Sequence, residues 1–257
     1  DSSHLVEDAD AAMYRAKESG GGRFLLFDEL TRQRAVARLQ TENALRLALE
    51  REELRVFFQP EVSIETAEIV GVEALVRWEH PVRGLLGPGE FISLAEETGL
   101  IVPLGTWVMR ESCRRARAWH DEGIVSDDFS MRVNVSARQL ASERLPGTVR
   151  QILVDTGLEP RHLCVEVTET LLIEDPTTSI ATLSALKELG VEVAVDDFGT
   201  GYSSLQHLRN FPIDCVKIDR SFVRGLPDSS EDAAIVGAVI ELGHALGLSV
   251  TAEGVET

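Results

Sequence analysis

Polar side chains recur near the ends of six apolar runs of the sequence, at positions where the strands of a parallel sheet would end. They are mostly carboxylates, with one amide and one amine among them: Glu73, Asn134, Glu166, Asp196, Asp197, Lys217 and Glu253. Carboxylates that face one another with so little positive charge repel and take up protons unless a hard cation joins them. Carboxylate oxygens are ligands that Mg²⁺ and Mn²⁺ prefer. The pattern therefore predicts a metal site.

Two of these carboxylates are adjacent in the sequence. Asp196 and Asp197 stand directly before the glycine-containing segment FGTGYSS at 198–204. One carboxylate of such a pair can bridge two ions while the other completes the second site. We therefore expect two ions, each Mg²⁺ or Mn²⁺.

The apolar runs alternate between apolar and polar residues with a period of two, as strands do. Met131, Val133 and Val135 alternate with Arg132 and Asn134, and similar alternation recurs at 163–168 and 249–253. Parallel strands covered by helices on both faces are apolar throughout, so a polar row requires a shared polar destination. The mouth of a barrel provides that destination, because alternate residues point to the barrel axis.

Strand-like runs alternate with longer helical patterns along the chain. We expect strands near 55–63, 69–78, 130–136, 163–169, 192–197, 215–219 and 249–254, and helices near 29–52, 102–122, 145–156, 177–189 and 230–246. Strand-then-helix repeats indicate parallel pairing. An open doubly wound sheet uses the same alternation, but the polar rows favour closure into a barrel.

Composition excludes several classes of partner and site. Lys and Arg number 25 against 43 Asp and Glu, which gives a net charge of −18 and predicts no binding to DNA. Three cysteines without a CxxC pair indicate neither a thiolate zinc site nor a disulfide framework, so we expect a reducing, cytoplasmic environment. The most apolar stretch, 233–250, is interrupted by Glu241 and His244, so no membrane contact is expected from this segment, although the full-length protein can be anchored elsewhere.

Six short motifs together resemble the signature blocks of one bacterial family, the EAL domain. They are EALVRW at 73–78, VNVS at 133–136, EVTE at 166–169, DDFGTGYSSL at 196–205, KID at 217–219 and AEGVE at 252–256. They occur in the family's order and spacing across about residues 40–257. The resemblance implies a (β/α)₈ TIM-like barrel that hydrolyses cyclic di-GMP to linear pGpG with divalent metal ions.

The resemblance also implies roles for individual residues. One metal would be held by Glu73, Asn134, Glu166 and Asp196, and the second by Asp196 and Asp197. The catalytic residues would be Lys217, which orients the nucleophile or offsets developing charge, and Glu253, which accepts or positions a proton. The substrate would be contacted by Gln59, Leu75 and Arg77. Glu169 would anchor the loop that follows Asp197.

Domain boundaries follow from the same resemblance. Residues 1–30 resemble the C-terminal remnant of a GGDEF domain and the start of a linker, and residues 31–257 form the EAL domain. The sequence ends before the eighth strand with its Gln-Gly pair that the family usually carries, so we expect a barrel without its last strand. A homodimer through the EAL domain is implied. Two other functions stay open: a catalytically impaired module that only binds cyclic di-GMP, and a structural remnant that does neither.

Overall fold

The computed structural model describes residues 13, 29–200, 209–226 and 229–255, with side chains from residue 36 onward. The predicted GGDEF remnant at 1–30 therefore lies almost entirely outside the described residues, as does most of the FGTGYSS segment. The sequence predicts the main strands and helices that follow to within a few residues.

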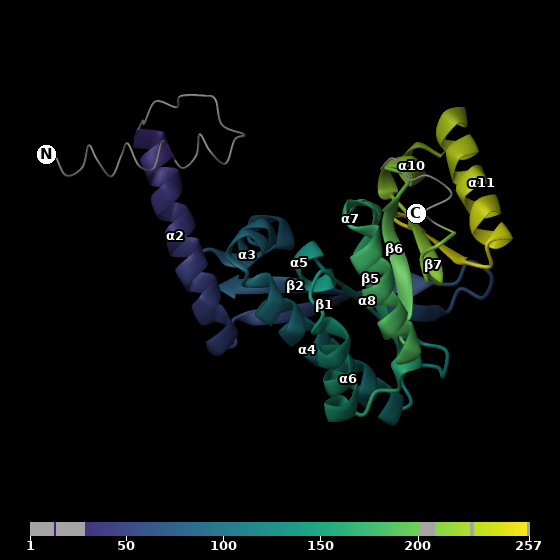
Figure 1. The fold of residues 1–257 in the computed structure, drawn as a ribbon, viewed down its shortest axis with the longest axis horizontal. Helices are drawn as coiled ribbons and strands as arrows, with labels where there is room; N and C mark the ends of the chain where they lie inside the picture. The colour runs from purple at the N-terminus through teal and green to yellow at the C-terminus, as the bar shows by residue number, and fades with distance from the viewer. Residues whose placement is uncertain (1–12, 14–28, 201–208, 227–228, 256–257) are drawn as a thin grey trace, which may run out of the picture.

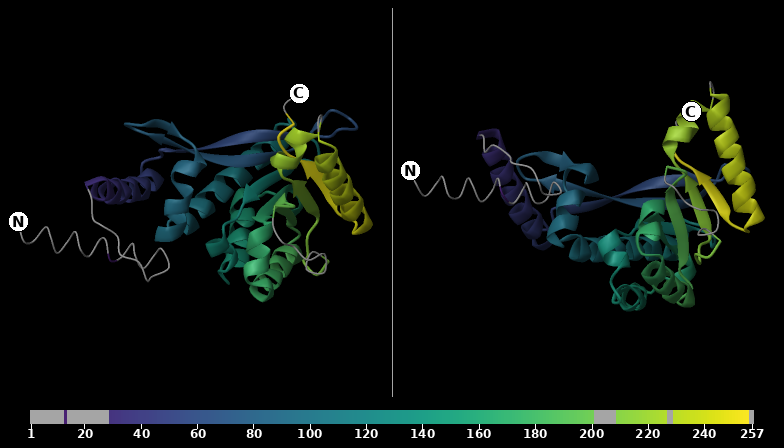
Figure 2. Two further views of the ribbon diagram at one scale, coloured as in Figure 1. Left: turned by 90° about the horizontal axis from the view of Figure 1, so that it is seen from above. Right: turned by 45° about the horizontal axis from the view of Figure 1, so that its top comes forward.

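One curled sheet forms the centre of the molecule (Figures 1 and 2). Its strands are β1 (Leu54–Val62), β2 (Ile69–His80), β3 (Gly84–Leu86), β4 (Ser130–Asn134), β5 (Leu163–Thr168), β6 (Glu192–Phe198), β7 (Cys215–Ile218) and β8 (Ser249–Ala252). Their order is β1-β2-β4-β5-β6-β7-β8, and β3 pairs with β2. Pairing is parallel from β2 to β8. With β1 and β8 as outer strands, the sheet is a half-closed TIM-like barrel, and the expected fold class is confirmed.

The strand-then-helix repeats predict parallel pairing, but β1 and β2 depart from that prediction. These two strands pair antiparallel from Leu54↔Trp78 to Val62↔Ile69. Residues 63–68 close the hairpin, where the Ser63 amide donates to the Glu68 carbonyl at 2.9 Å. A connection this short contains no crossover helix, and only antiparallel neighbours can be joined that way. The resulting ribbon extends beyond the curled sheet toward α2 and α3 (Figures 1 and 2).

Helices pack on the sheet, on one another or at the carboxyl ends of the strands. They are α2 (Glu29–Glu50), α3 (Ile92–Thr98), α4 (Ile101–Asp121), α5 (Ala137–Leu140), α6 (Leu145–Thr156), α7 (Glu169–Glu174), α8 (Pro176–Glu188), α10 (Arg220–Gly225) and α11 (Ser230–Ala245). Of these, α4 packs on β4, α8 on β6 and α11 on both β7 and β8. None of the described helices combines the length and apolarity needed to cross a bilayer.

The period-two pattern of the strands decides which side chains meet the helices. Val133, Val165, Val195 and Val216 lie on four successive parallel strands, and each is at most 1% exposed. Burial of such a side chain contributes roughly 1.5–3 kcal/mol to folding, so this apolar row holds the helices against the sheet. The residues of opposite parity face the concave side, as the alternation predicts.

The carboxyl ends of the strands lead into short helices whose caps fix the chain's exit. Strand β4 ends at Asn134, two residues earlier than expected, because Ser136 caps α5 instead of continuing the strand. Its hydroxyl accepts from the Gln139 amide, and the Gln139 side chain accepts in return from the Ser136 amide. Asp219 caps α10 after β7 in a similar way, accepting from the Ser221 amide at 2.9 Å.

Two residues on α6 provide a direct test of this packing. Ile152 is fully buried beneath the helix, whereas Val154 is 71% exposed. We expect Ile152→Ala to lower the free energy of unfolding by about 2–5 kcal/mol, because it leaves a cavity. The control Val154→Ala should change it by less than about 0.5 kcal/mol. Urea denaturation measures both, and equal effects would contradict the assigned orientation of α6.

Candidate active site

A buried lysine lies at the centre of the strand ends. Lys217 on β7 has a side chain only 1% exposed, and its Nζ lies within 4 Å of carboxylate oxygens from four other segments. These oxygens are Glu253 Oε1 at 2.7 Å, Glu166 Oε2 at 3.0 Å, Glu73 Oε2 at 3.2 Å and Asp196 Oδ1 at 3.3 Å. The structure thus brings together four carboxylates that are up to 180 residues apart in the sequence.

Asn134 completes one side of this group. Its Nδ2 donates to Glu73 Oε1 at 2.7 Å. Because β4 and β5 are in register, Asn134 also stands opposite Glu166. Glu73 therefore accepts from Asn134 with one oxygen and contacts Lys217 with the other, which fixes the orientation of its carboxylate.

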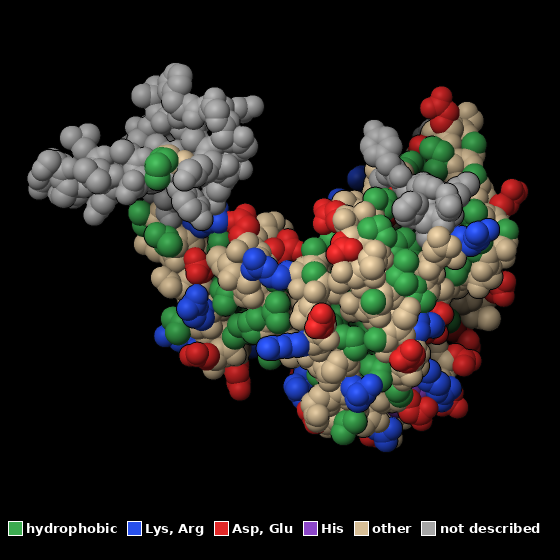
Figure 3. Space-filling view, in the orientation of Figure 1, with side chains coloured by type: hydrophobic (Ala, Val, Ile, Leu, Met, Phe, Trp, Pro, Cys, Tyr) green, Lys and Arg blue, Asp and Glu red, His purple; other side chains and the backbone are tan. Residues whose placement is uncertain are grey.

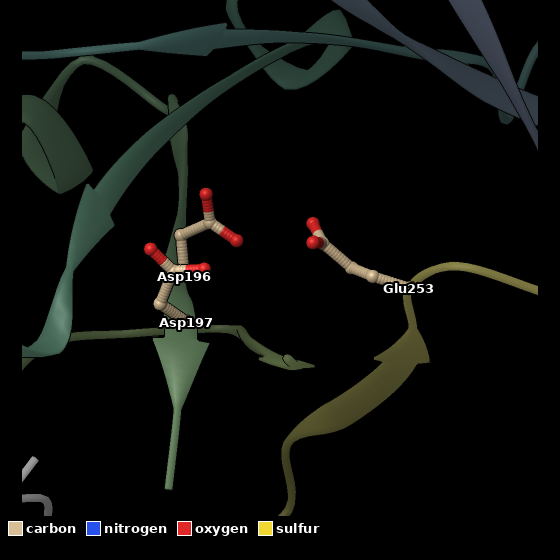
Figure 4. Close-up of side chains that lie close together, drawn as sticks. All are labelled: Asp196, Asp197 and Glu253. Atoms are coloured by element: carbon tan, nitrogen blue, oxygen red, sulfur yellow. The ribbon is translucent and has the colours of Figure 1, made fainter. Parts of the chain in front are cut away.

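Asp196 and Asp197 need an irregular backbone to serve one site, because successive strand residues normally point to opposite faces. The pairing of β6 with β7 shifts register between Val195 and Phe198, and Asp197 has a φ of +53°. A positive φ is uncommon for a residue other than glycine. The bulge brings carboxylate oxygens of both aspartates and of Glu253 to within 4.8 Å of one another. Figure 4 shows the Asp196 and Glu253 carboxylates pointing toward one another from β6 and from the end of β8.

The charges in this group do not balance. Five carboxyl groups face the single ammonium group of Lys217, and burial makes their ionisation costly. Burial raises the pKa of Glu166 to about 8 although Lys217 opposes the shift. Burial likewise raises the pKa of Glu253 to about 7, again against Lys217. The pKa of Asp197 is raised by burial and by its neighbour Asp196.

The environment favours the charged form of Lys217, whereas it favours the neutral form of Glu166. Burial by itself lowers the pKa of Lys217, but the surrounding carboxylates, led by Glu166 and Glu73, outweigh it and hold the pKa above its ordinary range. Lys217 therefore remains an ammonium ion at neutral pH. It is a permanent positive charge at the centre of the group.

The donor set fits divalent metal ions. The oxygens of Asp196, Asp197 and Glu253 are close enough together to share one ion. Glu166 Oε1 is buried and has no hydrogen-bond donor among the described residues. A buried acceptor without a donor costs free energy unless a cation or another group satisfies it. Added positive charge from hard cations would remove both the repulsion and the unsatisfied oxygen.

An ion pair beneath the carboxylates was not assigned any role from the sequence. Arg132 Nε lies 2.5 Å from Glu61 Oε2, and both side chains are about nine-tenths buried. The Arg132 guanidinium also lies 3.9 Å from Glu166 Oε1. Arg132 has the same strand parity as Asn134, so the alternation signalled its inward direction. Its partner Glu61 on β1 is 71 residues away, and no pattern in the sequence indicates that contact.

Three predicted substrate residues lie on the β1–β2 ribbon. Gln59 pairs with Glu73, and Leu75 and Arg77 follow Glu73 at intervals of two residues, so all share one face of the ribbon. Leu75 and Arg77 are half-buried and Gln59 is exposed. Leu75 and Arg77 therefore extend this face of the ribbon beyond Glu73, away from the other carboxylates.

Glu169, the predicted loop anchor, begins α7 directly after β5. Its side chain is buried, and Oε2 accepts from the Gly199 amide at 2.9 Å. The contact lies two residues beyond Asp197, at the start of the FGTGYSS segment. Residues 201–204 of that segment, like 205–208 after it, lie outside the described residues.

Comparisons with known proteins agree with these motifs. Residues 42–257 match the EAL domain. The chain is 47% identical over 253 residues to the bifunctional diguanylate cyclase/cyclic di-GMP phosphodiesterase MucR of Pseudomonas aeruginosa, a match that covers 98% of this chain and 37% of MucR. It is 42% identical over 257 residues to the cyclic di-GMP phosphodiesterase PdeR of Escherichia coli, covering 100% of this chain and 38% of PdeR. The chain thus spans less than two fifths of the length of both relatives.

A solved structure gives the same result for the fold. The PaMucR phosphodiesterase in complex with c-di-GMP superposes with a TM-score of 0.81 at 48% sequence identity. The superposition covers 85% of this chain and 87% of that chain.

The raised pKa of Glu166 predicts that metal binding releases a proton. At pH 7 the metal-free protein holds Glu166 mostly protonated, whereas a metal ligand requires the carboxylate form. We expect Mg²⁺ binding to release about one proton at pH 7 and the apparent affinity to rise from pH 6 to pH 8. Isothermal titration calorimetry in buffers of different ionisation enthalpy measures this release.

Glu166→Gln is the control for that titration, because the amide carries no titrating proton and the release should fall. Proton release near zero in the unaltered protein, with an affinity that does not change between pH 6 and pH 8, would contradict the assigned protonation states.

Proposed function

The chain belongs to the EAL domain family, and on that premise we propose that its half-barrel is a metal-dependent phosphodiesterase that hydrolyses cyclic di-GMP to linear pGpG. The observation that carries the proposal is the excess of carboxylates around Lys217, because it favours the binding of added cations at the strand ends. The relatives MucR and PdeR, named as cyclic di-GMP phosphodiesterases, support the choice of substrate.

Two sets of residues would hold the ions. Glu73, Asn134, Glu166 and Asp196 would hold one, and Asp196 with Asp197 would hold the other. When bound, Mg²⁺ or Mn²⁺ would make a water molecule more acidic and neutralise charge on the phosphate. The carboxylate oxygens of Asp196 and Asp197, which lie within 4.8 Å of one another, support the second of these sets.

Glu253 and Lys217 would carry out the remaining work of the site. Glu253, with a pKa of about 7 caused by its burial, is suited to accept a proton from the attacking water near neutral pH. Its Oε1 lies 2.7 Å from Lys217 Nζ, so the ammonium group holds the base in place and stabilises its charged form. The fixed charge of Lys217 would also offset negative charge that develops on the phosphate.

The β1–β2 ribbon would bind the substrate beside these groups. Arg77 can donate to phosphate oxygens or to a guanine edge, since guanidinium groups recognise such acceptors in bidentate fashion. Gln59 would donate or accept at the same face, and Leu75 would pack nearby. Glu169 would hold the segment after Asp197 through the Gly199 amide.

Several properties of the longer protein belong to the proposal as well. Residues 1–30 would be the end of a GGDEF domain, and residues 31–257 the EAL domain. The match to the bifunctional MucR covers 98% of the chain, which supports this division. The EAL domain would act as a homodimer in the cytoplasm, where its three buried, unpaired cysteines would stay reduced.

Incubation with cyclic di-GMP and Mg²⁺ or Mn²⁺ tests the proposal, with bound ligand and pGpG followed together. We expect turnover in the unaltered protein. Glu73→Ala should lower kcat at least about 100-fold, because it removes a metal ligand that also contacts Lys217. Arg77→Ala should instead raise KM roughly 10- to 100-fold, since it removes a charged hydrogen-bond donor to substrate.

Arg150→Ala is the control for these variants, because Arg150 is exposed on α6 and should leave both kinetic constants unchanged. Binding of cyclic di-GMP without any pGpG would contradict hydrolysis and favour the receptor function. The absence of both binding and product would reject the substrate.

A further inference from the structure

The β1–β2 ribbon carries an exposed aromatic ring that neither the core nor the carboxylate group uses. Phe57 on β1 is 47% exposed. In the antiparallel pairing Phe57 stands opposite Leu75, one inward-facing step along the ribbon from the pair Gln59↔Glu73. Directly paired residues of antiparallel strands project to the same face. Phe57 therefore lies on the face of the ribbon that holds Glu73 and the proposed substrate residues.

The neighbours of Phe57 show which side of β1 belongs to the core. Leu54 is buried, and Val56 and Phe58 pack against the core cluster on the helix-covered side. The Phe58 ring meets Trp119 of α4 edge-on, with ring centroids 5.0 Å apart. Phe57 has the opposite parity, so its exposure follows from the strand's alternation. A single exposed apolar residue is ordinary in itself, and its surroundings decide its meaning.

Those surroundings include an arginine whose charge is available. The Arg77 guanidinium carbon lies 5.6 Å from the centroid of the Phe57 ring, within the range of a cation–π contact. Arg77 Nη1 donates to its neighbour's carbonyl, Val76 O, at 2.9 Å. Among the described residues no carboxylate lies within 4.0 Å of this guanidinium. The nearby Arg55 differs, because Glu79 pairs with it at 2.7 Å.

We propose that Phe57 and Arg77 together form a stacking subsite for one purine base of the substrate. This inference rests on the proposed function and adds to it a specificity-determining residue. An aromatic ring binds a purine through its π face, and a guanidinium group can stack on the same base or donate to the adjoining phosphate. Leu75, directly opposite Phe57, extends the apolar floor of the subsite.

The geometry orders the parts of a nucleotide along the ribbon. Glu73 marks the position of the carboxylates and hence of the reacting phosphate, while Phe57 and Leu75 follow one inward-facing residue further on each strand. Consecutive residues on one face of a strand are about 6.6–7 Å apart, comparable to the separation of a nucleotide's phosphate from its base. The base would thus contact Phe57 while the phosphate meets the carboxylate group.

Three variants of Phe57 separate stacking from simple apolar packing. Phe57→Tyr retains a ring, Phe57→Leu retains apolar volume without a ring, and Phe57→Ala removes both. We expect Phe57→Leu and Phe57→Ala to raise the Kd for cyclic di-GMP, measured by calorimetry in EDTA, about 10- to 100-fold, and to raise KM with Mn²⁺ similarly. Phe57→Tyr should stay within about threefold of the unaltered protein. In all three, kcat should change less than about threefold.

Val62→Ala is the matched control, because Val62 is a similarly exposed apolar residue at the far end of β1 and should leave Kd and KM unchanged. Intermolecular nuclear Overhauser effects between the Phe57 ring protons and guanine H8 provide a second readout that a purely structural role would not produce.

The outcomes distinguish this inference from the function on which it rests. An unaltered protein that binds and cleaves cyclic di-GMP, with Phe57→Leu equal to it in Kd and KM, would overturn the stacking subsite alone. An unaltered protein that neither binds nor cleaves cyclic di-GMP would overturn both proposals. A loss in kcat without a change in KM would also overturn the subsite, because Phe57 would then act on chemistry instead of binding.

Discussion

The buried ammonium group of Lys217 is the interaction on which the site depends. It touches carboxylates from β2, β5, β6 and the end of β8, so it connects segments from most of the sheet's width. Removing one partner of such a buried network is costly, because the remaining charges stay desolvated. The lysine nevertheless cannot neutralise five carboxyl groups, and the remaining negative charge is the physical reason for expecting metal ions. On the face shown in Figure 3, acidic and basic side chains are interspersed over the surface.

The fold produces this concentration of charge by simple means. Parallel strands end at the same edge of the sheet, and their period of two directs alternate side chains to the concave side. Apolar residues of the other parity, such as Val165 and Val195, pack against the helices. Their burial contributes stability that offsets the repulsion between the like charges. The bulge at Asp196 and Asp197 departs from regular strand geometry, and it allows two neighbouring residues to serve one site.

The sequence was sufficient for whatever depends on local alternation. The inward direction of Glu166 and Lys217, the positions of the main strands and the helix at 145–156 follow from spacing alone. The sequence was insufficient for features that a tertiary contact determines. The antiparallel turn of β1 onto β2 is set by a short connection, and Ser136 reads equally well as strand or cap. The Arg132–Glu61 pair and the Phe57–Arg77 contact join residues on different strands, and a single sequence does not give their register.

The proposed hydrolysis depends on divalent ions that this group of side chains binds at the Asp196 and Asp197 carboxylates. An anomalous-difference map, calculated from crystals grown with Mn²⁺ and measured at the manganese absorption edge, tests it most directly. We expect strong peaks in contact with the Asp196 and Asp197 carboxylates, close to Lys217. A map without a peak at the strand ends, or with peaks only on the outer surface, would contradict it.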